Sequence, residues 1–302
     1  MKIGFIGVGN MGNPMCANVL AAGHEVTVND IDRSAAENLI EAGATWADSP
    51  QAAADGAEIV MMSLPTPPIV EQVVTGDGGV LAGMNGGTLV DLSTNSPSMV
   101  QSLAKIANEQ GVQFLDAPVS GGIVGARKGT LAVMVGGDEA VYDATKPTLE
   151  AIGHNVFHVG DVGSGNVAKL VNNMLAFIGM MGATEALALG AKAGVDPYKL
   201  WQIVKASSGN SFIWEGGARA ILRDRLRPSF TTSLASKDIG LATDLGKEVG
   251  VELPMGNAAQ DLIVGYRDNG FAEEDVLATV KAVEEAAGTK VRGFWPEDEE
   301  KR

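Results

Sequence analysis

The stretch KIGFIGVGNMGNPM, residues 2–15, decides the fold class of this chain. An apolar run of strand type is followed directly by three glycines, Gly7, Gly9 and Gly12, and then by a helix-like pattern. Alone, the Gly-x-Gly-x-x-Gly spacing is a weak signal, but between a strand and a helix it is typical of a dinucleotide-binding loop. There the first glycine permits the tight turn, the second admits a pyrophosphate, and the third lets the helix pack on the strand. The stretch therefore predicts a phosphate-binding loop rather than a simple turn.

The next predicted strand ends in an acidic residue that supports this interpretation. In EVTVNDIDR, residues 25–33, Asp30 lies eighteen positions after Gly12. This is close to the spacing expected for the carboxylate that binds the ribose hydroxyls of a dinucleotide. Such a carboxylate also repels a 2′-phosphate, whereas Arg33 nearby would attract one. The sequence thus predicts NAD as the cofactor, with NADP as the open alternative.

Short β-branched runs recur through the first half of the chain and alternate with helix-like segments such as 11–22 and 97–110. The predicted strands are residues 2–6, 25–29, 58–63, 88–92, 113–117, 131–135 and 155–159. Repeated strand–helix–strand units with almost continuously apolar strands indicate a parallel sheet that is covered on both faces. We therefore expect an α/β fold with a Rossmann doubly wound parallel sheet.

After about residue 160 the pattern becomes helical. A glycine-rich break, GDVGSGN, precedes a predicted long helix over residues 166–193. Shorter helices are expected near residues 197–206, 234–249, 255–268 and 274–286. The predicted organisation is a dinucleotide-binding domain over residues 1–162, a long inter-domain helix over 163–193, an all-helical C-terminal domain over 194–290 and a charged tail over 291–302.

Composition limits the classes of function. The formal net charge of −15 argues against nucleic acid and anionic membrane surfaces as partners. A single cysteine, Cys16, predicts a reducing compartment and hence a cytoplasmic protein. The N-terminus lacks the pattern of a secretion signal. The apolar stretch at residues 170–191 contains Asn172, Asn173 and Glu185, which favours a buried helix over a membrane span. No metal site is expected.

Two further glycine-rich stretches contain candidates for chemistry. In DAPVSGG, residues 116–122, Ser120 with Gly121 and Gly122 follows a predicted strand, where a hydroxyl and unblocked N–H groups suit a carboxylate ligand. An ordinary strand-to-helix turn is the alternative interpretation. In GSGNVAKLVNN, residues 163–173, Lys169 and Asn173 share one helix face.

Lys169 is flanked by apolar residues, so we expect its ammonium group to be partly removed from water. Removal from water lowers the pKa of an ammonium group toward neutrality, and the amine can then exchange a proton near neutral pH. Such an amine can serve as general acid or base toward a hydroxyl oxygen, and Asn173 can hold either the amine or the hydroxyl. The alternative is a lysine that extends its charge from a core helix to the surface.

These residues match a known family. The ordered set GFIGVGNMGNPM, DLSTNSP, DAPVSGG, GTLAVMVGG, GSGNVAKLVNN and SKDIGLA resembles the β-hydroxyacid dehydrogenases, and the resemblance extends from residue 2 to about residue 288. Members of that family include 3-hydroxyisobutyrate dehydrogenase, tartronate semialdehyde reductase and 2-(hydroxymethyl)glutarate dehydrogenase. The resemblance implies an oxidoreductase that transfers hydride reversibly between NAD(H) and a small β-hydroxy acid or its semialdehyde, working as a homodimer or homotetramer.

The resemblance also assigns roles to matched positions. Lys169 matches the catalytic lysine, Asn173 its partner, and Ser120–Gly122 the carboxylate-binding loop. Phe230 matches an aromatic position over the active site, and Trp214 is a further candidate for the pocket wall, with a core aromatic as the alternative. Ile123, Val124 and Arg127 would bear on substrate choice. The expected cofactor-binding residues are Gly7, Gly9, Asn10, Met11, Gly12, Asn29, Asp30, Leu64, Pro65, Thr94, Lys237 and Asp238.

Other functions stay open at the level of sequence. An oxidative decarboxylase like 6-phosphogluconate dehydrogenase places a histidine before the matched asparagine, where this chain has Asn172. Another alternative is a reductase of a different short semialdehyde acid, such as succinic semialdehyde. A non-catalytic cofactor-sensing module is a third, although Lys169 and Asn173 argue against it, since a sensor needs no proton donor. The residues do not rank the candidate hydroxy acids.

Overall fold

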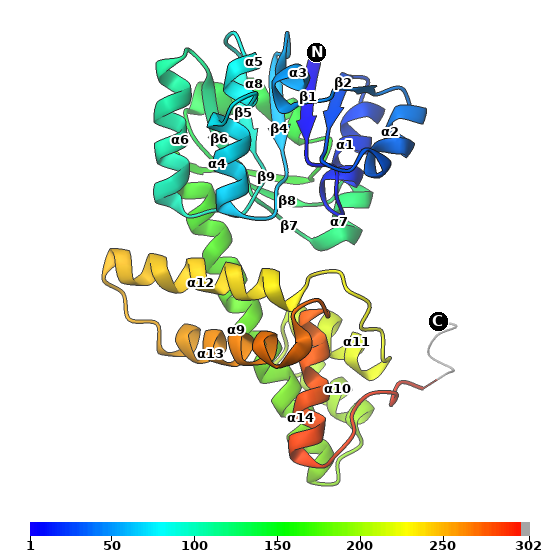
Figure 1. Ribbon diagram of the computed structural model, residues 1–302. Helices are drawn as coiled ribbons and strands as arrows, with labels where there is room; N and C mark the ends of the chain where they lie inside the picture. Colours follow the sequence, from blue (N-terminus) through cyan, green and yellow to red (C-terminus); the bar gives the residue numbers. More distant parts are fainter. Residues whose placement is uncertain (297–302) are drawn as a thin grey trace. The chain divides into compact units, whose positions relative to one another are not determined.

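The computed structural model describes residues 1–296 (Figure 1). The described chain forms two compact units, the first over residues 1–170 and the second from residue 171 onward. The division falls inside α9 (Ser164–Lys192), where the sequence pattern predicts a long helix. Part of the predicted charged tail, residues 297–302, lies outside the described residues.

The first unit contains the predicted sheet. Its strands β1 to β6 lie in the order β3-β2-β1-β4-β5-β6 and are all parallel, which is the order of a doubly wound nucleotide-binding sheet. The Rossmann prediction is confirmed. The strands are β1 (Lys2–Ile6), β2 (Glu25–Asn29), β3 (Thr45–Trp46), β4 (Ile59–Met62), β5 (Thr88–Asp91) and β6 (Gln113–Asp116).

The far edge of the sheet differs from the fully parallel sheet that the sequence predicts. β8 (Ala132–Gly136) runs antiparallel to β6 and to the two-residue strand β7 (Val119–Ser120), and β9 (Asn155–Gly160) runs parallel to β8. Only residues 121–131 connect β7 to β8, which is shorter than the dozen or more residues that a parallel crossover needs. The sheet is therefore mixed at this edge.

Helices cover both faces of the sheet because successive strand residues point to opposite sides. In β1, Ile3 and Phe5 belong to one apolar cluster, which α1, α2, α7 and α8 complete, and Ile6 belongs to the other, which α3 to α6 complete. The helices are α1 (Gly12–Ala21), η1 (Arg33–Ala36), α2 (Glu37–Glu41), α3 (Pro50–Ala54), α4 (Pro67–Thr75), α5 (Val80–Gly83), α6 (Pro97–Glu109), α7 (Gly122–Lys128) and α8 (Glu139–Leu149).

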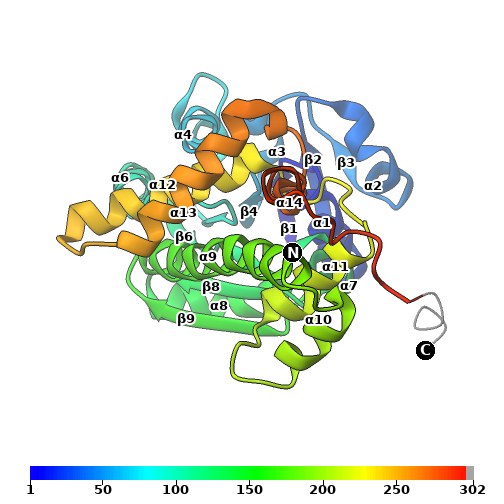
Figure 2. The same ribbon diagram turned by 90° about the horizontal axis from the view of Figure 1, so that it is seen from below.

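The second unit is helical, as predicted, and α12 and α13 lie side by side in it (Figure 2). Its two apolar clusters are built around Trp201 with Trp214 and around Phe177 with Ile239. Besides the end of α9, it contains α10 (Pro197–Lys205), η2 (Trp214–Ala218), α11 (Arg219–Leu222), α12 (Thr232–Val249), α13 (Pro254–Tyr266), η3 (Arg267–Phe271), η4 (Val276–Thr279) and α14 (Val280–Ala287).

Helix α9 is unusual in having apolar residues on a buried face and on an exposed face. It is long and apolar enough to cross a membrane by length and composition, and 33% of its most apolar window is buried. Val171, Leu175 and Leu189 are exposed on one side, while Phe177 and Leu187 are buried on the other.

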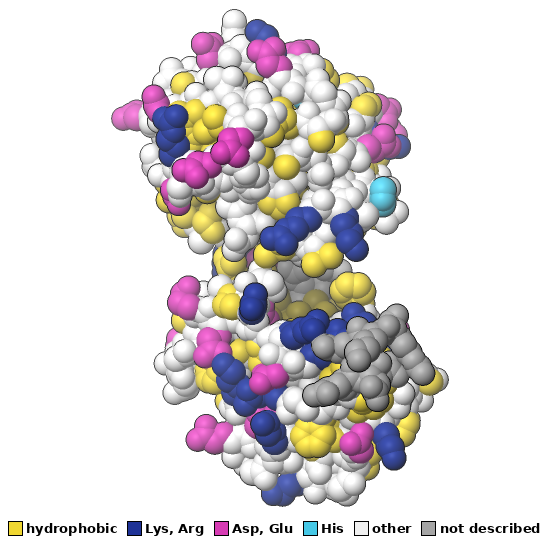
Figure 3. Space-filling model, turned by 90° about the vertical axis from the view of Figure 1, so that its right-hand side faces the viewer, with side chains coloured by type: hydrophobic (Ala, Val, Ile, Leu, Met, Phe, Trp, Pro, Cys, Tyr) yellow, Lys and Arg dark blue, Asp and Glu magenta, His cyan; other side chains and the backbone are white. Residues whose placement is uncertain are grey.

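Figure 3 shows acidic and basic side chains interspersed over the face that it draws.

Candidate active site

The glycine-rich loop joins β1 to α1, and its glycines have different surroundings. Gly7 has a φ of +82°, and a Cβ there would overlap the carbonyl oxygen of Ser63. A Cβ on Gly12 would overlap the carbonyl oxygen of Gly7. By contrast, apart from Gly9 and its two chain neighbours, no atom of residues 1–296 lies within 4 Å of the position that a Cβ on Gly9 would take. The outer two glycines are required by packing within the protein, and the middle one leaves open space.

The N-terminus of α1 is available to an anion. Met11 caps the helix without a side-chain hydrogen bond, and the first turn holds no acidic residue. In this turn Asn13 N donates to the carbonyl oxygen of Gly9 at 2.9 Å and Pro14 has no N–H, so it is the positive end of the helix dipole that favours a phosphate group at this point. Together with the open space at Gly9, the loop fits the pyrophosphate of a dinucleotide.

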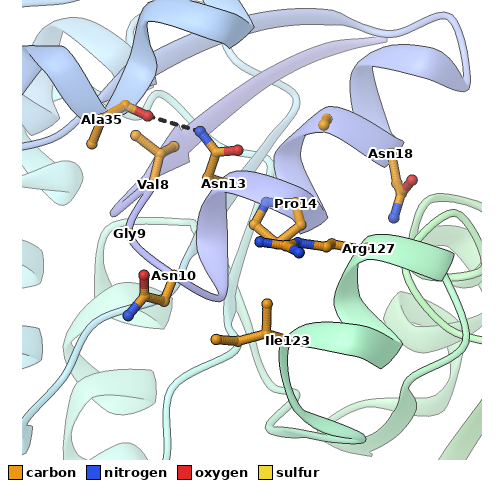
Figure 4. A pocket seen from close by; sticks show the side chains of 10 residues that line it. Val8, Gly9, Asn10, Asn13, Pro14, Asn18, Ala35, Ile123 and Arg127 are labelled. Atoms are coloured by element: carbon orange, nitrogen blue, oxygen red, sulfur yellow. Dashed lines mark hydrogen bonds between the residues drawn. The ribbon is translucent and has the colours of Figure 1, made fainter. Parts of the chain in front are cut away.

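A pocket of about 490 Å³ adjoins this loop (Figure 4). Gly9 and Asn10 line it from the loop, and Ile123 and Arg127 line it from α7. Asn18 Nδ2 donates to the carbonyl oxygen of Ala126 at 2.7 Å, which ties α1 to α7. Two residues predicted to influence substrate choice thus lie beside the phosphate-binding loop.

Asp30 lies at the end of β2 and faces the same loop. Its Oδ2 accepts a hydrogen bond from Val8 N at 2.7 Å, and its Oδ1 accepts one from Asp32 N at 3.0 Å. Asn29 is buried and donates from Nδ2 to the carbonyl oxygen of Ala47 at 2.9 Å. The guanidinium carbon of Arg33 lies 5.5 Å from the centre of the Trp46 ring. The carboxylate is therefore held next to the glycines at the carboxyl end of the sheet.

The loops after β4 and β5 meet at this same edge. Leu64 N donates to Ser93 Oγ at 2.9 Å, so the loop carrying Leu64 and Pro65 is fastened to the loop carrying Thr94. From β1 the strand order runs outward to β2 and β3 on one side, and from β4 it runs outward to β5 and β6 on the other. The crevice between β1 and β4, where the direction changes, is where doubly wound sheets bind dinucleotides.

The Ser120 loop begins α7. Ser120 ends β7, and the next two residues, Gly121 and Gly122, have φ of +135° and +61°. These values favour glycine at both positions. Gly121 caps α7 without a side-chain hydrogen bond. The loop therefore turns sharply from β7 into α7, and its binding of a carboxylate stays a prediction.

Lys169 and Asn173 lie one turn apart on the buried side of α9, with exposed fractions of 9% and 7%. Asn173 Nδ2 donates to Asp238 Oδ2 at 2.7 Å, and its Oδ1 accepts from Asn172 Nδ2 at 3.1 Å. Lys237 Nζ lies 2.8 Å from Asp238 Oδ1. The structure thus brings together Asn173, Lys237 and Asp238, three of the residues singled out from sequence.

The two aromatic candidates lie in the apolar clusters of the second unit. The Phe230 ring stacks on Phe177, with ring centres 6.0 Å apart. Trp214 is buried; its Nε1 donates to the carbonyl oxygen of Trp201 at 3.1 Å, and Trp201 Nε1 donates to the carbonyl oxygen of Trp214 at 3.2 Å. This pairing favours the core alternative for Trp214. Its place in a pocket wall stays a prediction.

Comparison with known proteins gives the same picture over the whole chain. Residues 2–160 match the NAD-binding domain of 6-phosphogluconate dehydrogenase, and residues 163–283 match the NAD-binding region of NADP-dependent 3-hydroxyisobutyrate dehydrogenase. A 2-(hydroxymethyl)glutarate dehydrogenase from Eubacterium barkeri is 41% identical over 97% of this chain and 98% of its own. A 3-hydroxyisobutyrate dehydrogenase from Pseudomonas aeruginosa is 43% identical over 86% of this chain and 90% of its own.

The chain belongs to the β-hydroxyacid dehydrogenase family. Its fold agrees with that of a solved relative, a 3-hydroxyisobutyrate dehydrogenase from Mycobacterium tuberculosis with L-serine. That structure has a TM-score of 0.84 and 32% identity, covering 93% of this chain and 98% of the relative. The family, the NAD(P) cofactor and the oxidoreductase activity on small hydroxy acids, all predicted from sequence, are confirmed. The roles of single residues stay predictions.

The burial of two aspartates in this dehydrogenase was not predicted from the sequence. Asp91 and Asp116 end neighbouring strands and are fully buried, together with Asn95 and Asn166. Burial raises the pKa of Asp91 to about 7 and also raises the pKa of Asp116. Both aspartates stand in the quoted family motifs, but nothing in the sequence shows which charged residues at strand ends are buried. Residues 1–296 contain no group of three or more His, Cys, Asp or Glu residues placed to hold a metal ion.

Proposed function

We propose that the enzyme interconverts a small β-hydroxy acid and its semialdehyde with NAD(H), and that Lys169 is the general acid and base. The observation that carries this proposal is the position of Lys169. Its side chain is nearly buried on the face of α9 that also carries Asn173. A lysine held away from water is suited to exchange a proton rather than to solvate a surface.

In the direction of oxidation, the neutral Lys169 amine removes the proton of the substrate hydroxyl while the carbon–oxygen double bond forms. The loops after β1, β4 and β5 would hold the dinucleotide, and its nicotinamide would supply the acceptor for the hydride from the same carbon. In the direction of reduction, the Lys169 ammonium returns its proton to the oxygen. The Asn173 amide nitrogen donates to Asp238, which leaves the amide oxygen as the hydrogen-bond acceptor of this side chain. It can therefore accept a hydrogen bond from the amine or the hydroxyl.

We assign the substrate carboxylate to the Ser120 loop. The Ser120 hydroxyl and the N–H groups of Gly121 and Gly122 are donors, and the two glycines have no side chain that would block the approach of an anion. Orienting the acid and the cofactor together accounts for a large part of such catalysis.

We expect a substrate of the 3-hydroxyisobutyrate, 2-(hydroxymethyl)glutarate or glycerate type. Two of the relatives described above act on the first two acids by name, and a third relative, at 37% identity over 96% of this chain, is a 2-hydroxy-3-oxopropionate reductase from Escherichia coli. The test is a panel of these acids, with serine and 4-hydroxybutyrate, followed by the absorbance of the reduced cofactor. Turnover of 4-hydroxybutyrate alone would favour a succinic semialdehyde reductase. Cofactor binding without turnover of any acid would favour a sensing module.

We propose NAD over NADP as the preferred cofactor. The Asp30 carboxylate lies beside the glycine loop, where a 2′-phosphate would meet like charge. Arg33, the residue that could offset this repulsion, stacks on Trp46. Running the same panel with both cofactors tests the preference, and a higher kcat/KM with NADP would contradict it.

Replacement of Lys169 tests the proton-transfer role. We expect Lys169→Met to lower kcat by at least about a hundredfold, because a positioned general acid or base contributes roughly that much or more. Binding of NADH, measured by its fluorescence, should stay unchanged. The control is Lys192→Met at the other end of α9, where the amine donates to the Gly288 carbonyl oxygen at 3.4 Å. Near-normal turnover of Lys169→Met would remove the assignment.

We also propose that the enzyme is a cytoplasmic homodimer or homotetramer. The exposed apolar residues Val171, Leu175 and Leu189 share one side of α9 and support association with a second copy, although the exposed Glu185 lies among them. Cys16 is buried, and burial raises the pKa of its thiol to about 12, which suits a structural cysteine in a reducing compartment.

A further inference from the structure

The carboxylate of Asp116 holds the first turn of α9 from a distant strand. Its Oδ1 accepts a hydrogen bond from Gly163 N at 2.7 Å. Its Oδ2 accepts from Asn166 N at 2.8 Å and from Asn166 Nδ2 at 3.1 Å. Since α9 begins at Ser164, the backbone N–H groups of Gly163 and Asn166 are among those that a helix leaves without partners inside itself. Asp116 therefore does for α9 what a capping residue usually does from the adjacent position.

The backbone around this carboxylate is packed too closely to shift. A Cβ on Gly165 would lie 2.6 Å from the Asp116 carbonyl oxygen and 2.9 Å from its Oδ2. A Cβ on Gly136, the β8 residue paired with Asp116, would overlap Oδ1. Glycine at both positions allows β6, β8 and the start of α9 to meet at the carboxylate.

A second set of hydrogen bonds joins this turn to the loop that carries Thr94. Asn166 Oδ1 accepts from Asn95 N at 2.7 Å, and Asn95 Nδ2 donates to Asp91 Oδ2 at 2.6 Å. Asp91 Oδ1 accepts from Ser93 N at 2.9 Å. Asp91, Asn95, Asn166 and Asp116 are all buried, so few of these bonds can be replaced by water. Thr94, one of the expected cofactor-binding residues, stands between Ser93 and Asn95 of this network.

Lys169 follows Asn166 by three residues, about 4.5 Å along the helix axis at 1.5 Å per residue. Because a helix is stiff over one turn, the placement of Asn166 determines where the Lys169 backbone lies. We propose that Asp116 is a positioning residue for the reaction: through Asn166 it fixes the first turn of α9, and with it the Lys169 amine, relative to the Thr94 loop. This inference rests on the proposed function of Lys169.

The substitution Asp116→Asn tests this role with little change of shape. The asparagine keeps one oxygen but presents an NH₂ group to an N–H donor of α9, and it removes the negative charge at the helix N-terminus. The matched control is Asp138→Asn. Asp138 caps α8 by accepting from Ala140 N at 2.9 Å and Val141 N at 3.1 Å, and it lies in none of the loops of the candidate site.

We expect Asp116→Asn to lower kcat at least tenfold, since small misplacements of a catalytic group cost large factors in rate. The KM for NAD should stay within about twofold, and the pH dependence of kcat should shift. Asp138→Asn should lower the melting temperature without changing kcat or its pH profile. A kcat for Asp116→Asn within twofold of the parent, or a loss equal to that of Asp138→Asn, would overturn the inference.

A milder variant covers the case in which Asp116→Asn does not fold. Asn166→Ala removes the side-chain hydrogen bond to Asp116 Oδ2 and the acceptor of Asn95 N, and it leaves the bonds of Asp116 to the two backbone N–H groups in place. We expect a two- to tenfold lower kcat with unchanged NADH binding, and no change in kcat would overturn the inference. If Lys169→Met is inactive while Asp116→Asn or Asn166→Ala has normal turnover, only the positioning role fails. If Lys169→Met retains turnover, the proposed function itself fails.

Discussion

Gly9 and Gly12 belong to one motif, but different contacts require them. Gly12 is in contact with the backbone of Gly7, so its lack of a side chain serves the packing of α1 on β1. At Gly9, no described residue other than its two chain neighbours has an atom within 4 Å of the place where a Cβ would be. The protein itself does not need a glycine there. The open space is explained by the ligand, because the motif admits a pyrophosphate at this position.

This difference predicts opposite outcomes for the same substitution. We expect Gly9→Ala to keep the melting temperature close to that of the parent and to raise the KM for NAD at least tenfold. Gly12→Ala should lower the melting temperature by several degrees, because α1 must move away from the loop. Thermal unfolding and NADH titration of both variants provide the measurement. An unchanged KM in Gly9→Ala would contradict the assignment of the open space to the cofactor.

Single residues could be predicted from the sequence where a local pattern determines them. The glycine spacing, Asp30 and the pair Lys169 and Asn173 are defined over a few turns or one strand–helix unit. The partners of Asp116 could not be found in this way, since Gly163 and Asn166 follow it by 47 and 50 positions. Only the fold brings these residues together.

At the scale of elements, long apolar strands and amphipathic helices could be predicted, and the shortest elements could not. The parallel core from β1 to β6 follows from continuous apolar runs, which indicate burial on both faces. β3 and β7 have two residues each, too few to show any periodicity. The direction of β8 depends on a short connection rather than on its own sequence. The sequence therefore predicted the longer strands of the sheet, β8 and β9 included, but neither the two-residue strands nor the direction of β8.

The exposed apolar residues of α9 lead us to expect that a second copy of the chain covers this side of the helix. Val171, Leu175 and Leu189 share one side of the helix and are 47%, 62% and 73% exposed. If a second copy covers this face, Leu175→Glu should reduce the assembly to a monomer with unchanged helical content, because a buried unpaired charge is costly. Light scattering after size-exclusion chromatography measures the mass. Ile106→Glu on α6, also at an exposed apolar residue, is the control and should keep the parent mass. A monomeric parent protein would contradict the proposed homo-oligomer.

At the scale of the whole molecule, the buried carboxyl groups link the stability of the fold to pH. Asp91 has a pKa of about 7 in the folded chain because burial disfavours its charged form, against an ordinary value of 3.8. Below about pH 4 the group is protonated in both states. Between about pH 4 and about pH 7 the folded state keeps a proton that the unfolded state loses, so the contribution of Asp91 to stability falls as the pH rises. Above about pH 7 the contribution of Asp91 to the free energy of unfolding has fallen by its full amount, on the order of a few kcal/mol.

Asp91→Asn should remove this pH dependence. The asparagine cannot ionise, and Asn95, whose Oδ1 has no hydrogen-bond partner among the described residues, can rotate its amide to accept from the new NH₂ group. We expect the variant and the parent to have similar melting temperatures at about pH 4, and the variant to melt several degrees higher at about pH 8. Calorimetry at steps of pH measures the difference between the two proteins, in which the titration of all other groups cancels. Asp138→Asn, at an exposed cap, should run parallel to the parent. A constant difference between Asp91→Asn and the parent would show that Asp91 is ionised in the folded state throughout this range, and that the hydrogen bonds from Ser93 N and Asn95 Nδ2 outweigh its burial.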